Sequence, residues 1–208
     1  MRQSYLAGTL SESDAAADWL TQFRAWFDAA AGTPAVSEPN AMQLATVDAS
    51  GRPSVRTVLC KGFDESGLVF YTNYDSAKGQ DLAARPYAAA VFAWLPLERQ
   101  VRLSGPVARV DPAETRAYFQ SRPRGSQLGA WASPQSAVVA SRAVLETRLD
   151  AVQQRFAGEL TIEPPPNWGG YRLRPDAVEF WQGRADRLHD RIRYRRRDDG
   201  WTAERLAP

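Results

Sequence analysis

The sequence contains a single cysteine, Cys60, so no disulfide can form within the chain. A lone thiol is typical of proteins that stay in a reducing compartment. No apolar run approaches the roughly 20 residues that a membrane-spanning helix needs, and the opening MRQSYLAGTLSESD lacks the apolar segment of a signal peptide. These absences predict a cytoplasmic protein that does not associate with a membrane.

The sequence also lacks an excess of charge of either sign, because its net charge at pH 7 is only +2. A field this weak gives no reason to expect a nucleic acid as a partner. The arginine run at 193–197 is followed at once by Asp198-Asp199-Gly200, which is typical of a hairpin turn. We therefore interpret this run as the charged end of a hairpin and not as an arm that binds nucleic acid.

Lysine and histidine are scarce. Of 26 basic residues only Lys61 and Lys78 are lysines, and His189 is the single histidine. A general preference for arginine would explain the few lysines, but both fall in segments with other signs of ligand binding. They are candidates for chemistry on that ground.

The composition that remains is that of one globular domain over residues 1–208. Hydrophobic residues make up 44% of the chain and seven residues are tryptophan, which is enough for one substantial core. Aromatic residues at helical spacing predict a packing helix over 13–31, with Ser11 or Ser13 as its N-cap.

Short alternating segments separated by Gly, Pro and Asp predict a mainly antiparallel sheet after this helix. The expected strands cover 42–47, 55–63, 68–72, 87–94, 98–103, 107–110 and 201–206. Tight turns between the first three predict a three-stranded meander. Further helices are expected over 75–85, 111–122 and 138–156, and loops over 128–134 and 164–171.

Two of the expected helices carry residues suited to an anion. Lys78 falls in the first turn of the helix over 75–85, where free amide groups and the helix dipole favour a phosphate. Tyr118 and Arg122 are four residues apart and so share one helix face. An arginine that neutralises a helix C-terminus would also fit this second pattern.

The stretch VEFWQGRADRLHDR at 178–191 contains the histidine. If it is extended, Arg187, His189 and Arg191 line one face of a strand, and Leu188 and Ile192 line the other. Two guanidiniums beside an imidazole suit a planar anionic molecule. An exposed strand face with an incidental histidine is the alternative.

The identities and order of the residues in this stretch are more informative than its charge pattern. Glu179-Phe180-Trp181-Gln182, followed after four residues by Arg187-Leu188-His189-Asp190-Arg191, resembles the C-terminal signature of the pyridoxamine 5'-phosphate oxidases. Similar blocks run from residue 2 to residue 208, among them RTVLCK at 56–61, FYTN at 70–73 and YFQSRPRGSQ at 118–127. The resemblance therefore covers nearly the whole chain.

This resemblance implies a mainly β fold with peripheral helices, the FMN-binding split β-barrel. It implies a homodimer with FMN at the interface and no metal. The implied reaction is oxidation of pyridoxine 5'-phosphate or pyridoxamine 5'-phosphate to pyridoxal 5'-phosphate, with O2 as acceptor and H2O2 as product. Segment 1–12 is implied to close over the substrate, and 168–208 holds the signature.

The resemblance also implies roles for individual residues. Those implied for the flavin are Arg56, Val58, Leu59, Lys61, Tyr71, Thr72, Lys78, Gln100, Gln135, Ser136, Trp181 and Arg191. Those implied for the substrate are Arg2, Tyr5, Lys61, Tyr118, Arg122, Ser126, Arg187 and His189, the last two as catalytic residues. Strict alternation would place Arg56 and Lys61 on opposite faces of a strand, so a bulge or strand end must intervene.

One position departs from the family pattern. Many members have Ser-Arg-Lys where this chain has Ser76-Ala77-Lys78, so one implied phosphate-binding arginine is absent. Two alternatives therefore stay open. One is a split-barrel flavin oxidoreductase with a different substrate, and the other is a non-catalytic protein that binds pyridoxal phosphate or flavin.

Overall fold

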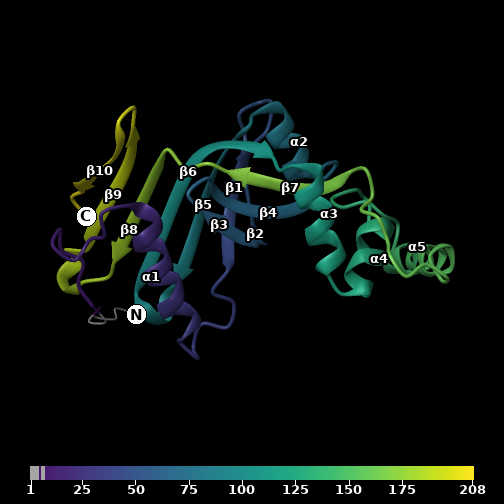
Figure 1. Ribbon diagram of the computed structural model, residues 1–208, viewed down its shortest axis with the longest axis horizontal. Coiled ribbons are helices and arrows are strands. Elements are labelled where there is room, and N and C mark those ends of the chain that lie inside the picture. The colour runs from purple at the N-terminus through teal and green to yellow at the C-terminus, as the bar shows by residue number, and fades with distance from the viewer. Residues whose placement is uncertain (1–4, 6–7) are drawn as a thin grey trace.

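The computed structural model describes Tyr5 and residues 8–208 as a β-barrel with helices on its outside (Figure 1). In this part of the chain the strands are β1 (Ala41–Val47), β2 (Pro53–Leu59), β3 (Gly62–Asp64), β4 (Gly67–Asn73), β5 (Tyr87–Trp94), β6 (Arg99–Arg109), β7 (Trp168–Leu173), β8 (Ala177–Gln182), β9 (Asp190–Arg197) and β10 (Gly200–Arg205). The helices are α1 (Trp19–Ala31), α2 (Ala77–Ala84), α3 (Pro112–Ser121), α4 (Arg124–Ala132) and α5 (Arg142–Arg155), with short 3-10 turns at Leu95–Leu97 and Ala185–Arg187. The predicted mainly β fold with peripheral helices is confirmed.

The strands pair antiparallel in the order β10-β9-β8-β6-β5-β1-β2, and β7 joins the second half of β6 to β4. β2 lies next to β4 without a hydrogen-bonded ladder between them, so the barrel is split at this point. Helices α3, α4 and α5 lie together at one end of the molecule, and β9 and β10 lie at the other (Figure 1). The fold therefore separates the chain's two richest groups of predicted site residues.

A glycine marks the point where β6 changes partners. Residues 99–104 of β6 pair with β8 and residues 107–109 pair with β7. Gly105 lies between these two sets, and a Cβ there would overlap the carbonyl group of Arg174. Because that carbonyl group belongs to backbone that the sheet holds in place, displacing it would cost free energy.

Gly105→Ala is therefore expected to lower the free energy of unfolding by about 3 kcal/mol. Gly125→Ala in α4 is the matched control, since nothing lies within 4 Å of its added Cβ and alanine favours a helix. Urea denaturation of both variants measures the difference. Equal midpoints for the two would show that the sheet accommodates the methyl group at Gly105.

Two helices begin later than predicted. α1 begins at Trp19 and not at residue 13, because the Asp18 carboxylate caps it by accepting from the Thr21 N–H at 2.8 Å and the Thr21 hydroxyl at 2.7 Å. α5 begins at Arg142 and not at residue 138, and Val138 is fully exposed. In both cases the apolar spacing extended beyond the residues that the cap and the packing support.

The predicted three-stranded meander is wrong. β1 pairs with β2 and β3 pairs with β4, as two hairpins. The chain leaves one pair for the other between Leu59 and Gly62, because the Cys60 N–H donates to Asn40 and the Lys61 N–H donates to Val69. The strand predicted over 55–63 is therefore interrupted at these two residues.

The two predicted loops are confirmed at 133–134 and 164–167 and wrong over the rest of their ranges. Residues 124–132 form α4, in which Leu128 and Ala132, four residues apart, are both buried. The Trp-Gly-Gly sequence at 168–170 begins strand β7. Glycine and proline made both stretches look irregular, although the packing of their neighbours makes them regular.

The described residues pack into two apolar clusters. The larger fills the barrel under α1, whose Trp19, Phe23 and Trp26 are buried as predicted. The smaller contains Phe119, Leu128, Phe156, Ile162 and Trp168, and it holds α3 and α4 against the start of β7. Across Tyr5 and residues 8–208 no helix is both long and apolar enough to cross a membrane.

Candidate active site

A pocket of about 320 Å³ opens where β2, β4, α2, α3 and the start of β7 meet. Its lining consists of Arg56, Thr57, Val58, Leu59, Lys61, Tyr71, Thr72, Lys78, Tyr118, Arg122, Gln135 and Trp168. Four of these side chains are cations and none is a carboxylate. The pocket is therefore suited to an anionic small molecule.

The strand break described above brings Arg56 and Lys61 to the same pocket. Arg56 lies within β2, and Lys61 lies beyond the end of that strand, so alternation no longer separates them. The Arg56 guanidinium donates to the Thr46 hydroxyl and lies 3.6 Å from the Asp81 carboxylate. It is thus held in place by residues behind the pocket, whereas Lys61 is exposed.

Lys78 is buried in the first turn of α2, as the sequence predicted for a phosphate cradle. Its ammonium group donates to Gln135 Oε1 at 2.9 Å, to Thr72 Oγ1 at 3.2 Å and to Ser76 Oγ at 3.3 Å. All three partners are neutral. Burial lowers the pKa of Lys78, and the nearby Arg56 lowers that pKa further. An anion in the pocket would stabilise both cations.

An aromatic wall forms the other side of the pocket. The rings of Tyr71 and Tyr118 stack with centroids 3.9 Å apart, and Trp168 stacks on Tyr71 at 5.4 Å. Burial raises the pKa of Tyr71 to about 12, with the charge of Glu114 as the next cause. Both phenols are therefore neutral at physiological pH, and their rings offer an apolar surface beside the cations.

Arg122 lies against this wall, and no carboxylate among the described residues forms an ion pair with it. Its Cζ is 4.7 Å from the Trp168 ring centroid and 5.5 Å from that of Phe119. Its Nη1 is buried and has no hydrogen-bond partner among the described residues. Burial lowers the pKa of Arg122. A partly buried guanidinium with an unused donor suits a site for a phosphate.

Two predicted residues near this pocket do not line it. Ser126 is exposed in the first turns of α4. Ser136 has a φ of 72° and lines a neighbouring depression with Asn73, Asp75 and Ala77. Sequence reasoning also missed Trp168 as a pocket residue, although its place in the Trp-Gly-Gly block was a usable signal.

The remaining predicted residues form a second group, on β6, β8 and β9. Gln100 is opposite Trp181 in the ladder between β6 and β8, and the Trp181 ring lies 4.7 Å from that of His189. Tyr5 contacts both rings, at 5.8 Å and 5.7 Å. Arg2 lies outside the described residues. The group therefore joins Tyr5 to the signature at the end of the chain.

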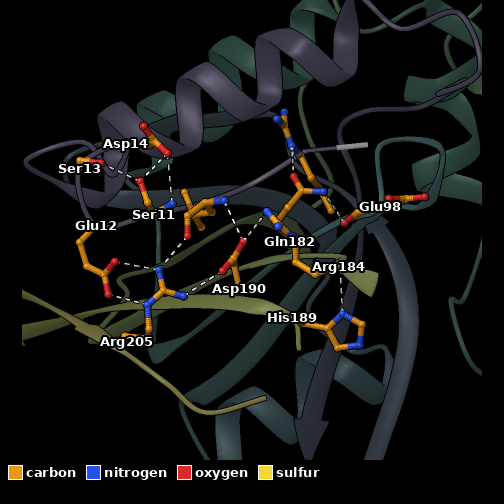
Figure 2. Close-up of polar contacts among 12 residues, drawn as sticks. Ser11, Glu12, Ser13, Asp14, Glu98, Gln182, Arg184, His189, Asp190 and Arg205 are labelled. Carbon is orange, nitrogen blue, oxygen red and sulfur yellow. Dashed lines mark hydrogen bonds and ion pairs between the residues drawn. The ribbon is translucent and has the colours of Figure 1, made fainter. Parts of the chain in front are cut away.

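The expectation that Arg187, His189 and Arg191 line one face of an extended strand is wrong. Residues 185–187 form a 3-10 turn in which Asp186 and Arg187 have positive φ angles, and β9 begins only at Asp190. His189 Nδ1 accepts from the Arg184 N–H at 3.1 Å (Figure 2). Arg191 is in β9 and pairs with the buried Glu179 at 2.9 Å.

Figure 2 shows a clamp that ties residues 10–14 to this second group. The Leu10 N–H donates to Asp190 at 3.1 Å. Arg205 donates to Asp190 and to the Leu10 carbonyl, each at 3.0 Å, and also to Glu12 at 2.9 Å. Gly183 leaves room for the Tyr5 ring, which a Cβ at that position would approach to 2.8 Å.

The two groups are not brought together within one chain. Strands β6, β5 and β1 lie between β8 and β2, which corresponds to roughly 20 Å along the sheet. None of Tyr5, Gln100, Trp181, Arg187, His189 or Arg191 lines the pocket. The pocket and the second group are thus two parts of the predicted site that intervening strands separate along the sheet.

The lone cysteine lies next to Lys61 but takes no part in the pocket. Burial raises the pKa of the Cys60 thiol to about 11. At pH 8 the folded protein is expected to react with a thiol reagent roughly 100-fold more slowly than the unfolded chain, because the thiolate is the reactive form. Following the reaction in buffer and in urea tests this. Equal rates would mean that the thiol is accessible and acidic.

Comparisons with known proteins identify the family of the chain. Residues 30–156 match the family model described as pyridoxamine 5'-phosphate oxidase, and residues 168–208 match the pyridoxine 5'-phosphate oxidase C-terminal dimerisation region. A pyridoxine/pyridoxamine 5'-phosphate oxidase of Saccharopolyspora erythraea is 55% identical over 100% of this chain and 94% of its own. One of Salinispora arenicola is 58% identical over 100% of this chain and 95% of its own.

The solved structure of PhzG from Burkholderia lata, in complex with tetrahydrophenazine-1-carboxylic acid, is also similar. It has a TM-score of 0.87 and 30% sequence identity, and the match covers 94% of this chain and 95% of that one. A pyridoxamine 5'-phosphate oxidase-related, FMN-binding protein from Nostoc punctiforme has a TM-score of 0.72 at 24% identity, covering 93% and 99%, which supports the fold. The chain belongs to the pyridoxamine 5'-phosphate oxidase family.

Proposed function

We propose that this protein oxidises pyridoxine 5'-phosphate and pyridoxamine 5'-phosphate to pyridoxal 5'-phosphate, with FMN as cofactor and O2 as acceptor. The observation that carries the proposal is the pocket lined by four cations and no carboxylate, beside a stacked aromatic wall. Two phosphorylated, planar molecules fit such a lining. Full-length relatives at 55% and 58% identity named as this oxidase support the substrate class.

The residues around Lys78 fit the FMN phosphate. Lys78, the held guanidinium of Arg56 and the N-terminus of α2 supply positive charge and free N–H groups at one end of the pocket. Val58, Leu59, Tyr71 and Thr72 would border the flavin, with Gln135 and Ser136 beyond them. When bound, FMN accepts two electrons from the substrate's C4' carbon and passes them to dioxygen, which yields hydrogen peroxide.

Arg122, Tyr118 and Lys61 would hold the substrate. Arg122 lines the pocket and has a donor without a partner among the described residues, and the Tyr118 hydroxyl can donate to the same phosphate. Ser126 would join them only by a rearrangement of α4. Arg187 and His189 would contact the pyridine ring. Because His189 Nδ1 accepts a hydrogen bond, the neutral ring carries its proton on Nε2 and offers that N–H as a donor.

The second group would reach the pocket from another copy of the chain. One face of the sheet is covered by the core, but on the other face Ala45 and Val91 are only partly buried, Ala89 is exposed and Val55 is 67% exposed. An open apolar sheet face of this kind favours a partner. The match of residues 168–208 to a dimerisation region supports a homodimer in which Gln100, Trp181, Arg187, His189 and Arg191 of one chain face the pocket of the other.

The proposed reaction does not involve nucleic acid. Two of the arginines in the run at 193–197 have a carboxylate partner within the hairpin. Arg193 pairs with Glu204 at 2.6 Å, and Arg197 pairs with the same carboxylate group at 3.4 Å. Paired charges on a short hairpin attract phosphates less than a free basic run would.

A flavin spectrum tests the proposal directly. Protein reconstituted with FMN is expected to lose its absorbance near ~450 nm on anaerobic addition of pyridoxine 5'-phosphate and to regain it in air. A bound flavin that stays oxidised would reject the substrate. Failure to bind FMN would reject the cofactor and favour a binding protein. Unphosphorylated pyridoxine is the matched control, because a different substrate class, such as the carboxylic acid bound by PhzG, would not need the phosphate.

Ala77 offers a test of the cofactor's orientation. It is exposed at the first position of α2, next to Lys78, where many family members have arginine. Ala77→Arg is expected to lower the dissociation constant of FMN about threefold, as one more exposed cation near a phosphate should. Quenching of FMN fluorescence measures it, with Ala83→Arg at the far end of α2 as the control. Equal effects of both substitutions would place the phosphate elsewhere.

A further inference from the structure

We propose that Trp168 is a positioning residue for the phosphate of the substrate. Its indole holds the Arg122 guanidinium and the Tyr118 ring in the arrangement that receives the anion. This inference deepens the proposed function and rests on it for the identity of the substrate. It assigns a specific task to a residue that precedes both glycines of the Trp-Gly-Gly block.

Trp168 is one of the three stacked rings of the aromatic wall. Its ring is nearly parallel to those of Tyr118 and Tyr71, with interplanar angles of 6° and 13°. Phe119 meets it edge-on at 5.0 Å, and the Arg122 Cζ lies 4.7 Å from its centroid. The indole thus lies against the Arg122 guanidinium and is parallel to the Tyr118 ring at a centroid distance of 6.3 Å, and it is itself 8% exposed.

The backbone holds the indole rigidly. Trp168 is the first residue of β7 and is paired with Asn73 of β4. The next two residues are glycines, and a Cβ at Gly170 would come within 2.8 Å of the Tyr71 ring. The absence of a side chain at Gly170 allows Tyr71 to lie against the strand, and its absence at Gly169 makes room for Tyr74. Trp168 is thus fixed by the sheet on one side and by stacked rings on the other.

An aromatic face can orient the Arg122 guanidinium without neutralising its charge, which a carboxylate could not do. Among the described residues no carboxylate forms an ion pair with Arg122, and its buried Nη1 has no partner. A carboxylate would fix the guanidinium but would also neutralise it and compete with the incoming phosphate. The indole attracts the cation through its ring quadrupole and leaves the N–H donors free. Arg122 is therefore oriented and still available to an anion.

Binding measurements on FMN-loaded protein test this role. Trp168→Leu is expected to raise the dissociation constant of pyridoxal 5'-phosphate about 10- to 30-fold, as loss of a desolvated cation–π contact should. The inhibition constant of inorganic phosphate should rise by a similar factor. Binding of pyridoxal, which lacks the phosphate, should change less than twofold. Trp168→Phe keeps an aromatic face and should raise the first constant only about threefold.

A double-mutant cycle separates positioning from general damage. In an Arg122→Gln background, Trp168→Phe should have no further effect on pyridoxal 5'-phosphate, because the residue that it positions is gone. The proposal is overturned if Trp168→Phe weakens pyridoxal and pyridoxal 5'-phosphate equally, or if its effect persists in the Arg122→Gln background. Because Trp168→Leu removes a buried ring and could impair folding, the decision rests on the phenylalanine variant.

The inorganic phosphate arm distinguishes this inference from the proposed function. If wild-type protein is not reduced by pyridoxine 5'-phosphate but its phosphate binding still depends on Trp168 through Arg122, the substrate is wrong and the positioning role stands. If wild-type protein oxidises that substrate and Trp168→Phe leaves the binding of both pyridoxal 5'-phosphate and inorganic phosphate unchanged, the function stands and the role of Trp168 is rejected.

Discussion

Replacing Lys78 with methionine is expected to weaken FMN binding by roughly 30- to 150-fold, the value of a charge-assisted hydrogen bond to a buried anion. Methionine keeps the length of the side chain and removes its charge. Lys78 donates to three neutral oxygens, those of Thr72, Ser76 and Gln135, so no buried carboxylate is left unpaired by the change. The Thr72 hydroxyl still donates to Gln135 at 2.8 Å.

The same substitution should not lower the stability of the FMN-free protein. Burial lowers the pKa of Lys78, which means that the folded state disfavours its charged form. Below the ordinary lysine pKa the unfolded chain holds that proton at no such penalty, so removing the charge relieves the folded state. Loss of FMN affinity with an unchanged or higher melting temperature is therefore expected.

Fluorescence titration of FMN and thermal melts measure the two quantities. Arg85→Gln is the matched control, because Arg85 caps the opposite end of α2 and its guanidinium donates to the carbonyls of Asp48 and Ala49. It should leave FMN affinity within about twofold. If Lys78→Met bound FMN as tightly as this control, the phosphate would not lie at the N-terminus of α2.

Two inactive variants are expected to restore activity to each other when they are mixed. One carries Lys78→Met and Arg122→Gln in the pocket, and the other carries Arg187→Gln and His189→Ala in the second group. If each site is built from the pocket of one chain and the second group of its partner, a mixed dimer contains one intact site. Random pairing of equal amounts should give about one quarter of the wild-type activity.

The parents should each retain less than about 1% of wild-type activity, since each removes two groups that contact the substrate or cofactor. The mixture is made by unfolding and refolding the two chains together. Turnover of pyridoxine 5'-phosphate is then measured. A mixture of Lys78→Met with Arg122→Gln is the matched control, because both changes lie in the pocket and every mixed dimer still has one defect in each pocket.

Activity no greater than the average of the parents would show that one chain supplies the whole site. The separation of the two groups argues against that outcome, because β6, β5 and β1 lie between β8 and β2. A site supplied by one chain would require the 3-10 turn at Ala185–Arg187 to move across the sheet. The open face with Ala45, Ala89 and Val91 is a simpler route for a partner.

The sequence by itself determined the family and much of the local structure. Ser76 before α2 and Asp111 before α3 are caps whose side chains accept from backbone N–H groups, as their residue types predict. The turn at Asp198-Asp199-Gly200 closes the β9–β10 hairpin as expected, and Gly200 has a φ of 132°. Caps and turns are decided by residues a few positions apart, so the sequence alone specifies them.

The tertiary structure decided which predicted residues meet. Alternation placed Arg187, His189 and Arg191 on one face only because it assumed an extended strand, and the positive φ angles of Asp186 and Arg187 break that assumption. Conversely, Arg56 and Lys61 share a pocket because the backbone changes hydrogen-bond partners between Leu59 and Gly62. Neither departure has a signal in the residues next to it.

The surroundings of Trp168 show why the local sequence could not predict which residues meet. Gly169 and Gly170 were interpreted as part of a loop, yet they allow β7 to pass close to Tyr74 and Tyr71. Those tyrosines are almost 100 positions earlier in the chain, and only the pairing of β7 with β4 brings them to the glycines. A glycine that serves a close approach looks the same in sequence as one that serves a turn. The resemblance of the sequence to the family could therefore name residues of the pocket, but long-range strand pairing decided how their side chains are held.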